Sequence, residues 1–141
     1  MGYVLRSLFA MLPVLSMVAP AAANEANILT NTRWELESMI EGRMVWEPSG
    51  RTDVTLEFQA DGKATGRAPC NYYFASYTVE GNTLSMSSAG STRMWCEGVM
   101  EQEGRYLRAL ALANTFELVG DELRIVYGNG QGTLIFERDD D

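Results

Sequence analysis

The sequence contains no histidine and only two cysteines, which removes much of the usual enzyme chemistry. Without histidine the chain lacks the commonest general acid–base residue and the commonest metal ligand, so histidine-based triads are excluded. Cys70 and Cys96 do not form the C-x-x-C spacing that redox and zinc sites use. No cofactor or metal is therefore expected, and the absences favour a protein that is not an enzyme.

Basic residues are also scarce. Lys and Arg total 11 against 19 Asp and Glu, which gives a net charge of −8. Nucleic acid and anionic membrane surfaces attract clustered basic residues, so neither is expected as a partner. We interpret the acidity as solvation of the surface, which also favours a soluble monomer.

The chain lacks an apolar run long enough to cross a membrane. The stretch Leu8–Val18 is shorter than the roughly 18 residues that a spanning helix needs. It follows Arg6 and precedes the small residues Ala21-Ala22-Ala23, which is the order of a cleavable secretion signal. We predict cleavage after Ala23 rather than an uncleaved anchor. Since no cysteine stands there to take a lipid, the product is expected in the periplasm or secreted.

The remaining sequence has the length of one domain and shows no repeat or low-complexity tract. We expect a signal peptide over residues 1–23, a flexible leader over 24–31, one folded domain over 32–137 and an acidic tail over 138–141.

Most of that domain alternates between apolar and polar residues, the pattern of half-buried strands. Val54, Leu56 and Phe58, for example, alternate with polar neighbours. Glycine-containing pairs such as Asp61-Gly62 separate these runs and are typical of tight turns. The pattern predicts about eight or nine short strands joined mostly as hairpins, an antiparallel sheet that protects its edges by closing into a small barrel. The glycine-rich stretch Gly128–Gly132 leads into a strand, not a helix, which argues against a phosphate-binding loop.

One segment has helical spacing instead. Between Glu97 and Ala113 the apolar residues, Tyr106 and Leu110 among them, recur on one side of a helix. The fold class is therefore mainly β (α+β), with one α-helix packed against a small β-barrel-like sheet. Glu101 and Glu103 lie two positions apart on this helix and point in different directions, so they do not suit the paired carboxylates of a glycosidase.

Two cysteines in an exported protein predict a disulfide between Cys70 and Cys96. The chain-entropy model assigns such a loop about 3.5 kcal/mol of stabilisation. The alternative is a pair of buried free thiols.

Several segments, in this order and at this spacing, resemble the META domain family of HslJ-like, heat-inducible envelope proteins. They are Trp34-Glu35-Leu36, Val54–Phe58, Cys70-Asn71, Tyr77, Ser91–Cys96, Glu103, Leu107 and Leu110. The resemblance extends from Thr32 to Phe136. It implies a compact β-barrel with one helix, an envelope location and a link to stress, and it implies no reaction.

Glu103 falls on the apolar side of the helix, where a carboxylate must be paired or hydrogen-bonded. Asn71 and Arg93, with Thr92 close by, are candidate polar partners because they lie beside the cysteines. Glu103 then serves either as a structural clasp between helix and barrel, which we favour, or as a ligand-binding group. Trp95 is either an exposed recognition residue or, as we favour, a core aromatic beside the disulfide.

The leading hypothesis is a non-enzymatic periplasmic protein that serves envelope homeostasis by binding. Two rival hypotheses come next, with an enzyme as the third. One is a carrier that holds a small ligand in its barrel, and the other is an inhibitor or partner of another envelope protein.

Overall fold

The computed structural model describes residues 13–16, 28–49 and 52–140. The proposed cleavage site after Ala23 and most of the predicted signal peptide and leader lie outside these residues. Within the described residues, no helix is both long and apolar enough to span a membrane.

The described residues form ten strands and one α-helix. They are β1 (Arg33–Glu41), β2 (Met44–Trp46), β3 (Thr55–Phe58), β4 (Lys63–Arg67), β5 (Tyr72–Glu80), β6 (Thr83–Met86), β7 (Gly90–Ser91), α2 (Met100–Ala111), β8 (Ala113–Val119), β9 (Glu122–Tyr127) and β10 (Gly132–Asp139). The helix is shorter at both ends than the predicted segment from Glu97 to Ala113, because Gly98 at φ +82° precedes it and β8 begins at Ala113.

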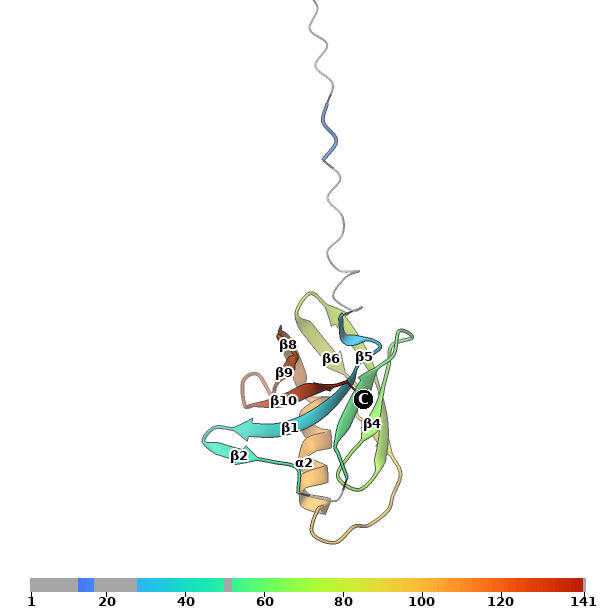
Figure 1. Ribbon diagram of the computed structural model, residues 1–141, viewed down its shortest axis with the longest axis vertical. Helices are drawn as coiled ribbons and strands as arrows, with labels where there is room; N and C mark the ends of the chain where they lie inside the picture. Colours follow the sequence, from blue (N-terminus) through green and yellow to red (C-terminus); the bar gives the residue numbers. More distant parts are fainter. Residues whose placement is uncertain (1–12, 17–27, 50–51, 141) are drawn as a thin grey trace, which may run out of the picture.

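Eight of the strands close into an antiparallel barrel in the order β1-β3-β4-β5-β6-β8-β9-β10, and β10 pairs with β1 to complete the ring (Figure 1). This confirms the predicted mainly β barrel with one helix. The two additional strands lie off the ring: β2 extends β1 as a hairpin, and the two-residue β7 pairs with β5. Both are short, and for that reason the alternation pattern alone did not predict them.

The helix fills space inside the ring. The ring of Tyr106 lies 5.7 Å from that of Tyr73 in β5 and 6.4 Å from that of Phe136 in β10, measured between centroids. These two strands stand on different sides of the barrel, so α2 packs across its interior and is visible behind β1 in Figure 1. Large side chains that are fully buried complete the core: Trp34, Phe58, Tyr127, Leu56, Leu84, Leu123 and Ile125, with others.

The folded domain extends beyond both predicted boundaries. Leu29, expected in a flexible leader, is fully buried and its carbonyl accepts a hydrogen bond from Trp34 Nε1 at 3.4 Å. Arg138 and Asp139, expected in an acidic tail, belong to β10 and pair with β1. Both boundaries were wrong for the same reason: too few residues lie beyond them for an alternating pattern to be recognised.

Candidate functional site

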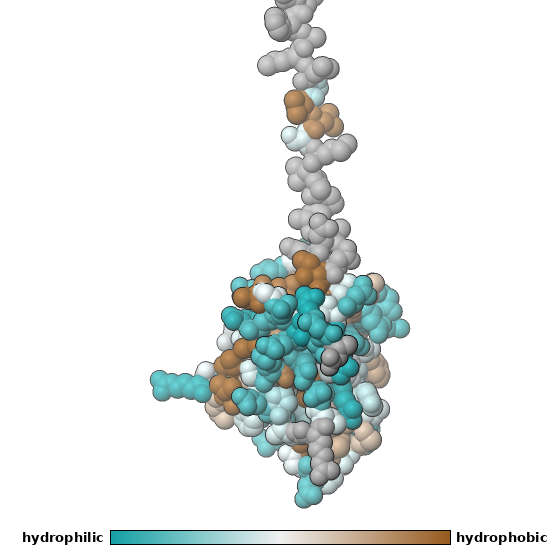
Figure 2. Space-filling model, viewed as in Figure 1, coloured by the Kyte–Doolittle hydropathy of each residue, from teal (hydrophilic) through white to brown (hydrophobic). Residues whose placement is uncertain are grey.

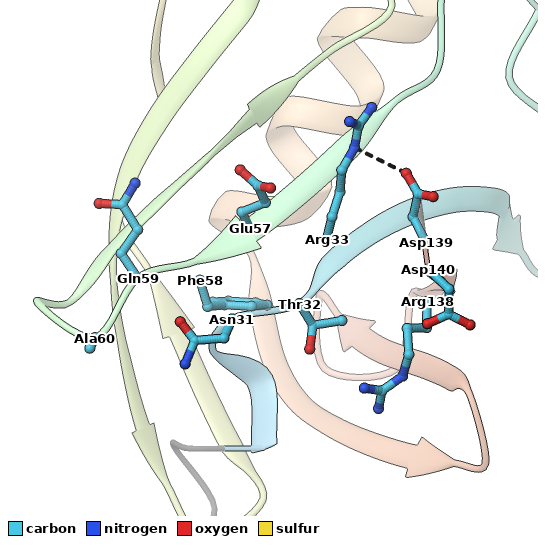
Figure 3. A pocket seen from close by; sticks show the side chains of 10 residues that line it. All are labelled: Asn31, Thr32, Arg33, Glu57, Phe58, Gln59, Ala60, Arg138, Asp139 and Asp140. Atoms are coloured by element: carbon cyan, nitrogen blue, oxygen red, sulfur yellow. Dashed lines mark ion pairs between the residues drawn. The ribbon is translucent and has the colours of Figure 1, made fainter.

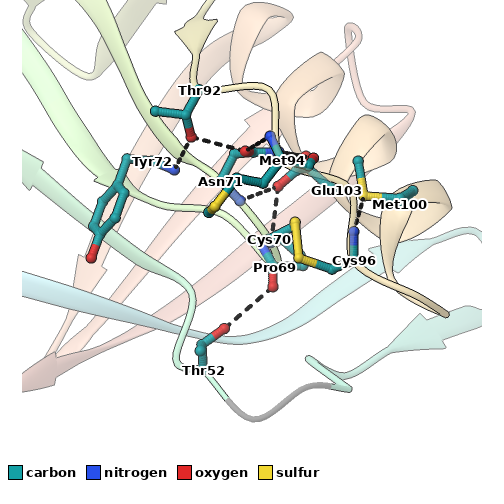
Figure 4. Close-up of a disulfide and its surroundings, with 10 residues drawn as sticks. All are labelled: Thr52, Pro69, Cys70, Asn71, Tyr72, Thr92, Met94, Cys96, Met100 and Glu103. Atoms are coloured by element: carbon teal, nitrogen blue, oxygen red, sulfur yellow. Dashed lines mark hydrogen bonds between the residues drawn. A yellow bond between two sulfur atoms is a disulfide. The ribbon is translucent and has the colours of Figure 1, made fainter.

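The carboxylate of Glu103 lies buried on the face of α2 that meets the barrel (Figure 4). Its Oε1 accepts hydrogen bonds from the backbone N–H groups of Cys70 at 2.9 Å and Asn71 at 2.7 Å. Its Oε2 accepts one from Asn71 Nδ2 at 2.8 Å. These donors replace the water that a buried carboxylate loses. The helix is thereby tied to the turn between β4 and β5.

Asn71 is itself buried and extends the network to the segment that follows β7. Its Oδ1 accepts from the backbone N–H of Met94 at 2.7 Å and from the Thr92 hydroxyl at 2.8 Å. Its Nδ2 also donates to the carbonyl of Met94 at 3.1 Å. Together with the bond to Glu103, these contacts use the amide oxygen and both amide hydrogens of the side chain.

The disulfide between Cys70 and Cys96 fixes the same place covalently and confirms the predicted pairing. Its two Cα atoms are 5.7 Å apart, and the bond joins the β4–β5 turn to the residue four positions before the helix begins. We call Cys70, Asn71, Cys96 and Glu103 the clasp. The network holds the β4–β5 turn, the segment after β7 and α2 at one point.

Two of the predicted site residues lie elsewhere than expected. Of the two candidate partners of Glu103, Asn71 bonds to the carboxylate, whereas Arg93 is exposed and does not. Trp95 is 74% exposed, and the preferred interpretation as a core aromatic was wrong. Its neighbours explain this orientation, since the backbone of Met94 is held inward by Asn71 and Cys96 by the disulfide.

Four large apolar side chains are exposed on the two segments that the clasp holds together. They are Tyr72 (56% exposed) and Phe74 (63%) on β5, and Met94 (51%) and Trp95 (74%) after β7. The segments run side by side, because β7 pairs with β5 and the Thr92 backbone N–H donates to the carbonyl of Tyr72 at 3.0 Å. We call these four residues the aromatic ribbon.

Sequence reasoning singled out only Trp95 among the four residues of the aromatic ribbon. Tyr72 and Phe74 alternate with Tyr73 and Ala75, which point into the barrel. Aromatic residues at the outward positions of a strand were the available signal, because such positions are normally polar when one face of a sheet meets water.

A groove of 550 Å³ runs along the outer face of the sheet next to the aromatic ribbon, with Arg67, Tyr72 and Phe74 among its lining residues. The guanidinium of Arg67 lies 5.3 Å from the centroid of the Tyr72 ring, within the range of a cation–π contact. Within the described part of the chain, neither Arg67 nor Arg93 belongs to an ion pair. The groove therefore combines exposed aromatic surface with the guanidinium of Arg67, and the carboxylate of Glu57 also lines it.

A pair of buried tyrosines lies beneath the clasp. The hydroxyls of Tyr73 and Tyr106 are 2.7 Å apart, and that of Tyr73 also bonds to the carbonyl of Thr55 at 2.6 Å. Burial raises the pKa of both phenols, so both stay neutral and joined in the folded protein. Gly66 makes this contact possible, because a Cβ there would meet the Thr55 carbonyl oxygen at 2.0 Å.

A larger depression of 690 Å³ lies where β1 begins and β10 ends, and Figure 3 shows the side chains around it. Its two guanidinium groups are already paired within the protein, since Arg33 Nε lies 3.2 Å from Asp139 Oδ2 and Arg138 Nε lies 3.6 Å from Asp121 Oδ1. We therefore do not treat it as the primary site.

The clasp is built to hold structure and shows no reactive arrangement. Each oxygen of Glu103 already accepts a hydrogen bond from the β4–β5 turn, which accounts for a structural role of the carboxylate. Among residues 13–16, 28–49 and 52–140, no group of three or more His, Cys, Asp and Glu side chains is placed to hold a metal ion.

Comparison with solved structures finds the same fold in other proteins. A protein from Burkholderia xenovorans, solved by NMR, is 26% identical with a TM-score of 0.69 and covers 94% of this chain and 100% of its own. A second NMR structure is 21% identical with a TM-score of 0.61, covering 79% and 92%. The crystal structure of a DUF4847 family protein from Bacteroides vulgatus is 11% identical with a TM-score of 0.60, covering 82% and 97%.

No curated protein matches this sequence. The family model of the META domain matches residues 27–141, which includes the barrel, the helix and every residue of the clasp. The chain belongs to the META domain family.

Proposed function

We propose that this protein acts in the cell envelope by binding another protein through the aromatic ribbon, and that it catalyses no reaction. The observation that carries the proposal is the exposure of four large apolar side chains on two adjacent segments. Large apolar side chains exposed on adjacent segments of a surface are typical of a region that contacts a partner. Tyr and Trp are also the residues that most often dominate binding energy at interfaces.

The backbone behind the aromatic ribbon is held in place before any partner arrives. The disulfide fixes one end of the segment after β7, and Asn71 fixes Met94 through two backbone hydrogen bonds. Ordering a loop on binding costs free energy, so a segment that is already ordered binds more tightly for the same contacts. The clasp therefore supports binding without touching the partner.

The charges around the aromatic ribbon favour an acidic partner surface. Arg67 and Arg93 lie beside it and form no ion pair within the described residues, although the chain as a whole carries a net charge of −8. Carboxylates around an apolar centre would complement these two guanidinium groups and speed association. The envelope location rests on the N-terminal signal pattern and on the disulfide, which persists in oxidising compartments.

The packing of the barrel argues against the rival hypothesis of a small-ligand carrier. A carrier needs an interior cavity, whereas the rings of Tyr106 and Phe136 meet in the interior, and both residues are fully buried, as is Trp34. The depressions described above lie on the outer surface instead.

The test combines crosslinking in cells with a binding measurement. A photo-crosslinking amino acid is placed at Phe74 or Trp95 and, as a control, at Val119, an exposed apolar position on β8. We expect one envelope protein to be captured from the first two positions and not from the third. With that partner purified, Trp95→Ser should weaken binding about thirtyfold, the factor that corresponds to a hot-spot residue, while Val119→Ser should not.

Equal capture from all three positions, or equal affinities of the two serine variants, would contradict the proposal. Circular dichroism of each variant shows that a lost interaction reflects the surface and not the fold.

A further inference from the structure

The strand β2 has one edge that pairs with no other strand in the described part of the chain, and just beyond its end the carbonyl of Glu47 accepts a hydrogen bond from Gln102 Nε2 at 2.8 Å. The strand pairs only with β1, through Met39–Trp46, Ile40–Val45 and Glu41–Met44. Figure 1 shows this hairpin reaching outward from the barrel, and Figure 2 shows apolar surface beside it. Met44 is 56% exposed and Val45 is 61% exposed. A free strand edge with apolar side chains is a template for pairing with another strand.

The backbone of Val45 faces that free edge. Glu41 and Met44 close a hairpin whose loop is Gly42-Arg43, so they form a hydrogen-bonded pair. In an antiparallel ladder the next pair, Ile40 and Val45, is not hydrogen-bonded across the hairpin. The N–H and C=O of Val45 therefore point away from β1 and are available to a further strand.

Side chains on the outer face of the sheet also favour an added strand beside Val45. A row of partly exposed, β-branched residues runs in register across five neighbouring strands, from β8 to β2. Its members, in order, are Thr115, Val126, Thr133, Ile40 and Val45. β-branched side chains that face each other across strands stabilise sheets. A strand added beside β2 with a β-branched residue opposite Val45 would continue this row.

The sequence of the edge is complementary to itself. It reads Arg43-Met44-Val45-Trp46-Glu47. In an antiparallel pairing of two copies centred on Val45, Arg43 of each copy faces Glu47 of the other and Met44 faces Trp46. Within the described residues, neither Arg43 nor Glu47 belongs to an ion pair, and both are exposed.

We propose that the β2 strands of two copies of this chain, residues 44–46, pair antiparallel about Val45, with the side chains of Arg43 and Glu47 facing each other at the ends, joining two barrels through a two-fold axis. Such an interface is isologous, because each contact occurs twice with the roles exchanged. Two ion pairs at its ends set the register, and Val45 meets its own counterpart at the centre. The interface is short, so the dimer forms in a concentration-dependent way. It lies on β2, whereas the aromatic ribbon lies on β5 and after β7, so the two proposals stand independently.

Sedimentation equilibrium of the full chain tests this proposal. We expect a monomer–dimer equilibrium whose dissociation constant rises about tenfold in Arg43→Glu and in Glu47→Arg, since each reversal places like charges opposite one another twice. The double variant Arg43→Glu/Glu47→Arg restores the pairs in exchanged positions and should return to within about twofold of the original value. Val45→Pro removes the outward N–H, which an edge strand tolerates, and should leave a monomer.

Two results would overturn the proposal. A protein that stays monomeric up to millimolar concentration has no such interface. A dimer that resists the charge reversals, or that dissociates instead with Phe74→Ser on the aromatic ribbon, uses another surface. Unfolding midpoints of all variants, measured in urea, establish that each remains folded.

Discussion

Replacing Glu103 tests whether this residue is a buried structural carboxylate or an ordinary surface carboxylate. Glu103→Ala removes the acceptor of three hydrogen bonds and leaves the backbone donors of Cys70 and Asn71 and one side-chain donor of Asn71 unpaired. Each buried donor without an acceptor costs about 1–3 kcal/mol. Because water can enter the vacated polar space, we take the lower end for each and expect a loss of about 3 kcal/mol in the free energy of unfolding.

Glu103→Gln is a second variant, for which we expect a smaller loss of stability than for Glu103→Ala. Its side-chain oxygen can still accept from both backbone N–H groups, but its amide nitrogen then faces Asn71 Nδ2, donor against donor. Asn71 has no other rotamer to offer, because turning its amide over would break its bonds to Met94 and Thr92. We expect a loss of about 1–2 kcal/mol, between the original protein and the alanine variant.

The assay is equilibrium unfolding in urea, with Glu101→Ala as the control. Glu101 stands two residues earlier on the same helix, and its side chain is 77% exposed with an ion pair to Arg105 at 3.1 Å. Removing it should change stability by less than about 0.5 kcal/mol. If Glu103→Ala and Glu101→Ala unfold at the same urea concentration, Glu103 is not a structural clasp.

Three further predictions concern covalent, steric and ionic features. The double variant Cys70→Ser/Cys96→Ser should lose about 3.5 kcal/mol in urea unfolding, and reductant should then have no further effect. Gly66→Ala should lose at least about 1 kcal/mol, because its Cβ would meet the backbone oxygen of Thr55 at 2.0 Å. Burial raises the pKa of the Glu37 carboxyl above 4.5. A hydrogen bond with a neighbouring carboxyl, and repulsion from neighbouring carboxyls, raise this pKa further. The folded state therefore holds that proton more tightly and loses stability as pH rises through the raised value. Glu37→Gln should unfold at higher urea than the original protein at pH 7, by less than about 1 kcal/mol, and at the same urea near pH 4.

The architecture was predictable because its signals repeat along the chain. Alternating apolar residues and glycine turns mark most strands, and Gly62, Gly81 and Gly120 do adopt the positive φ angles that such turns require. The helix interrupts that pattern with a different period, so it was recognised too. Short elements carry too few residues for either period, which is why β2, β7 and both domain boundaries were missed or misplaced.

The candidate site was only half predictable. Burial of Glu103 follows from its place on an apolar helix face, and the sequence restricted its partners to a few polar residues near the cysteines. Two of its three donors, however, are backbone N–H groups, which every residue except proline possesses and no sequence pattern marks. The choice of Asn71 over Arg93 depended on which side of the segment after β7 faces the helix. That orientation is a property of the closed barrel, not of the local sequence.

The orientation of this segment also links the buried polar groups to the side chains that are exposed at the surface. A free segment carrying Met94 and Trp95 would turn these side chains toward the protein, because burial of apolar surface is favourable. Here the backbone on either side is held inward by Asn71 and by the disulfide of Cys96, so Trp95 is left facing water. Glu103 in turn fixes Asn71 by two hydrogen bonds. Glu103 thus helps to determine which aromatic side chains the domain exposes, and under the proposed function the binding surface depends on buried residues that a partner would not contact.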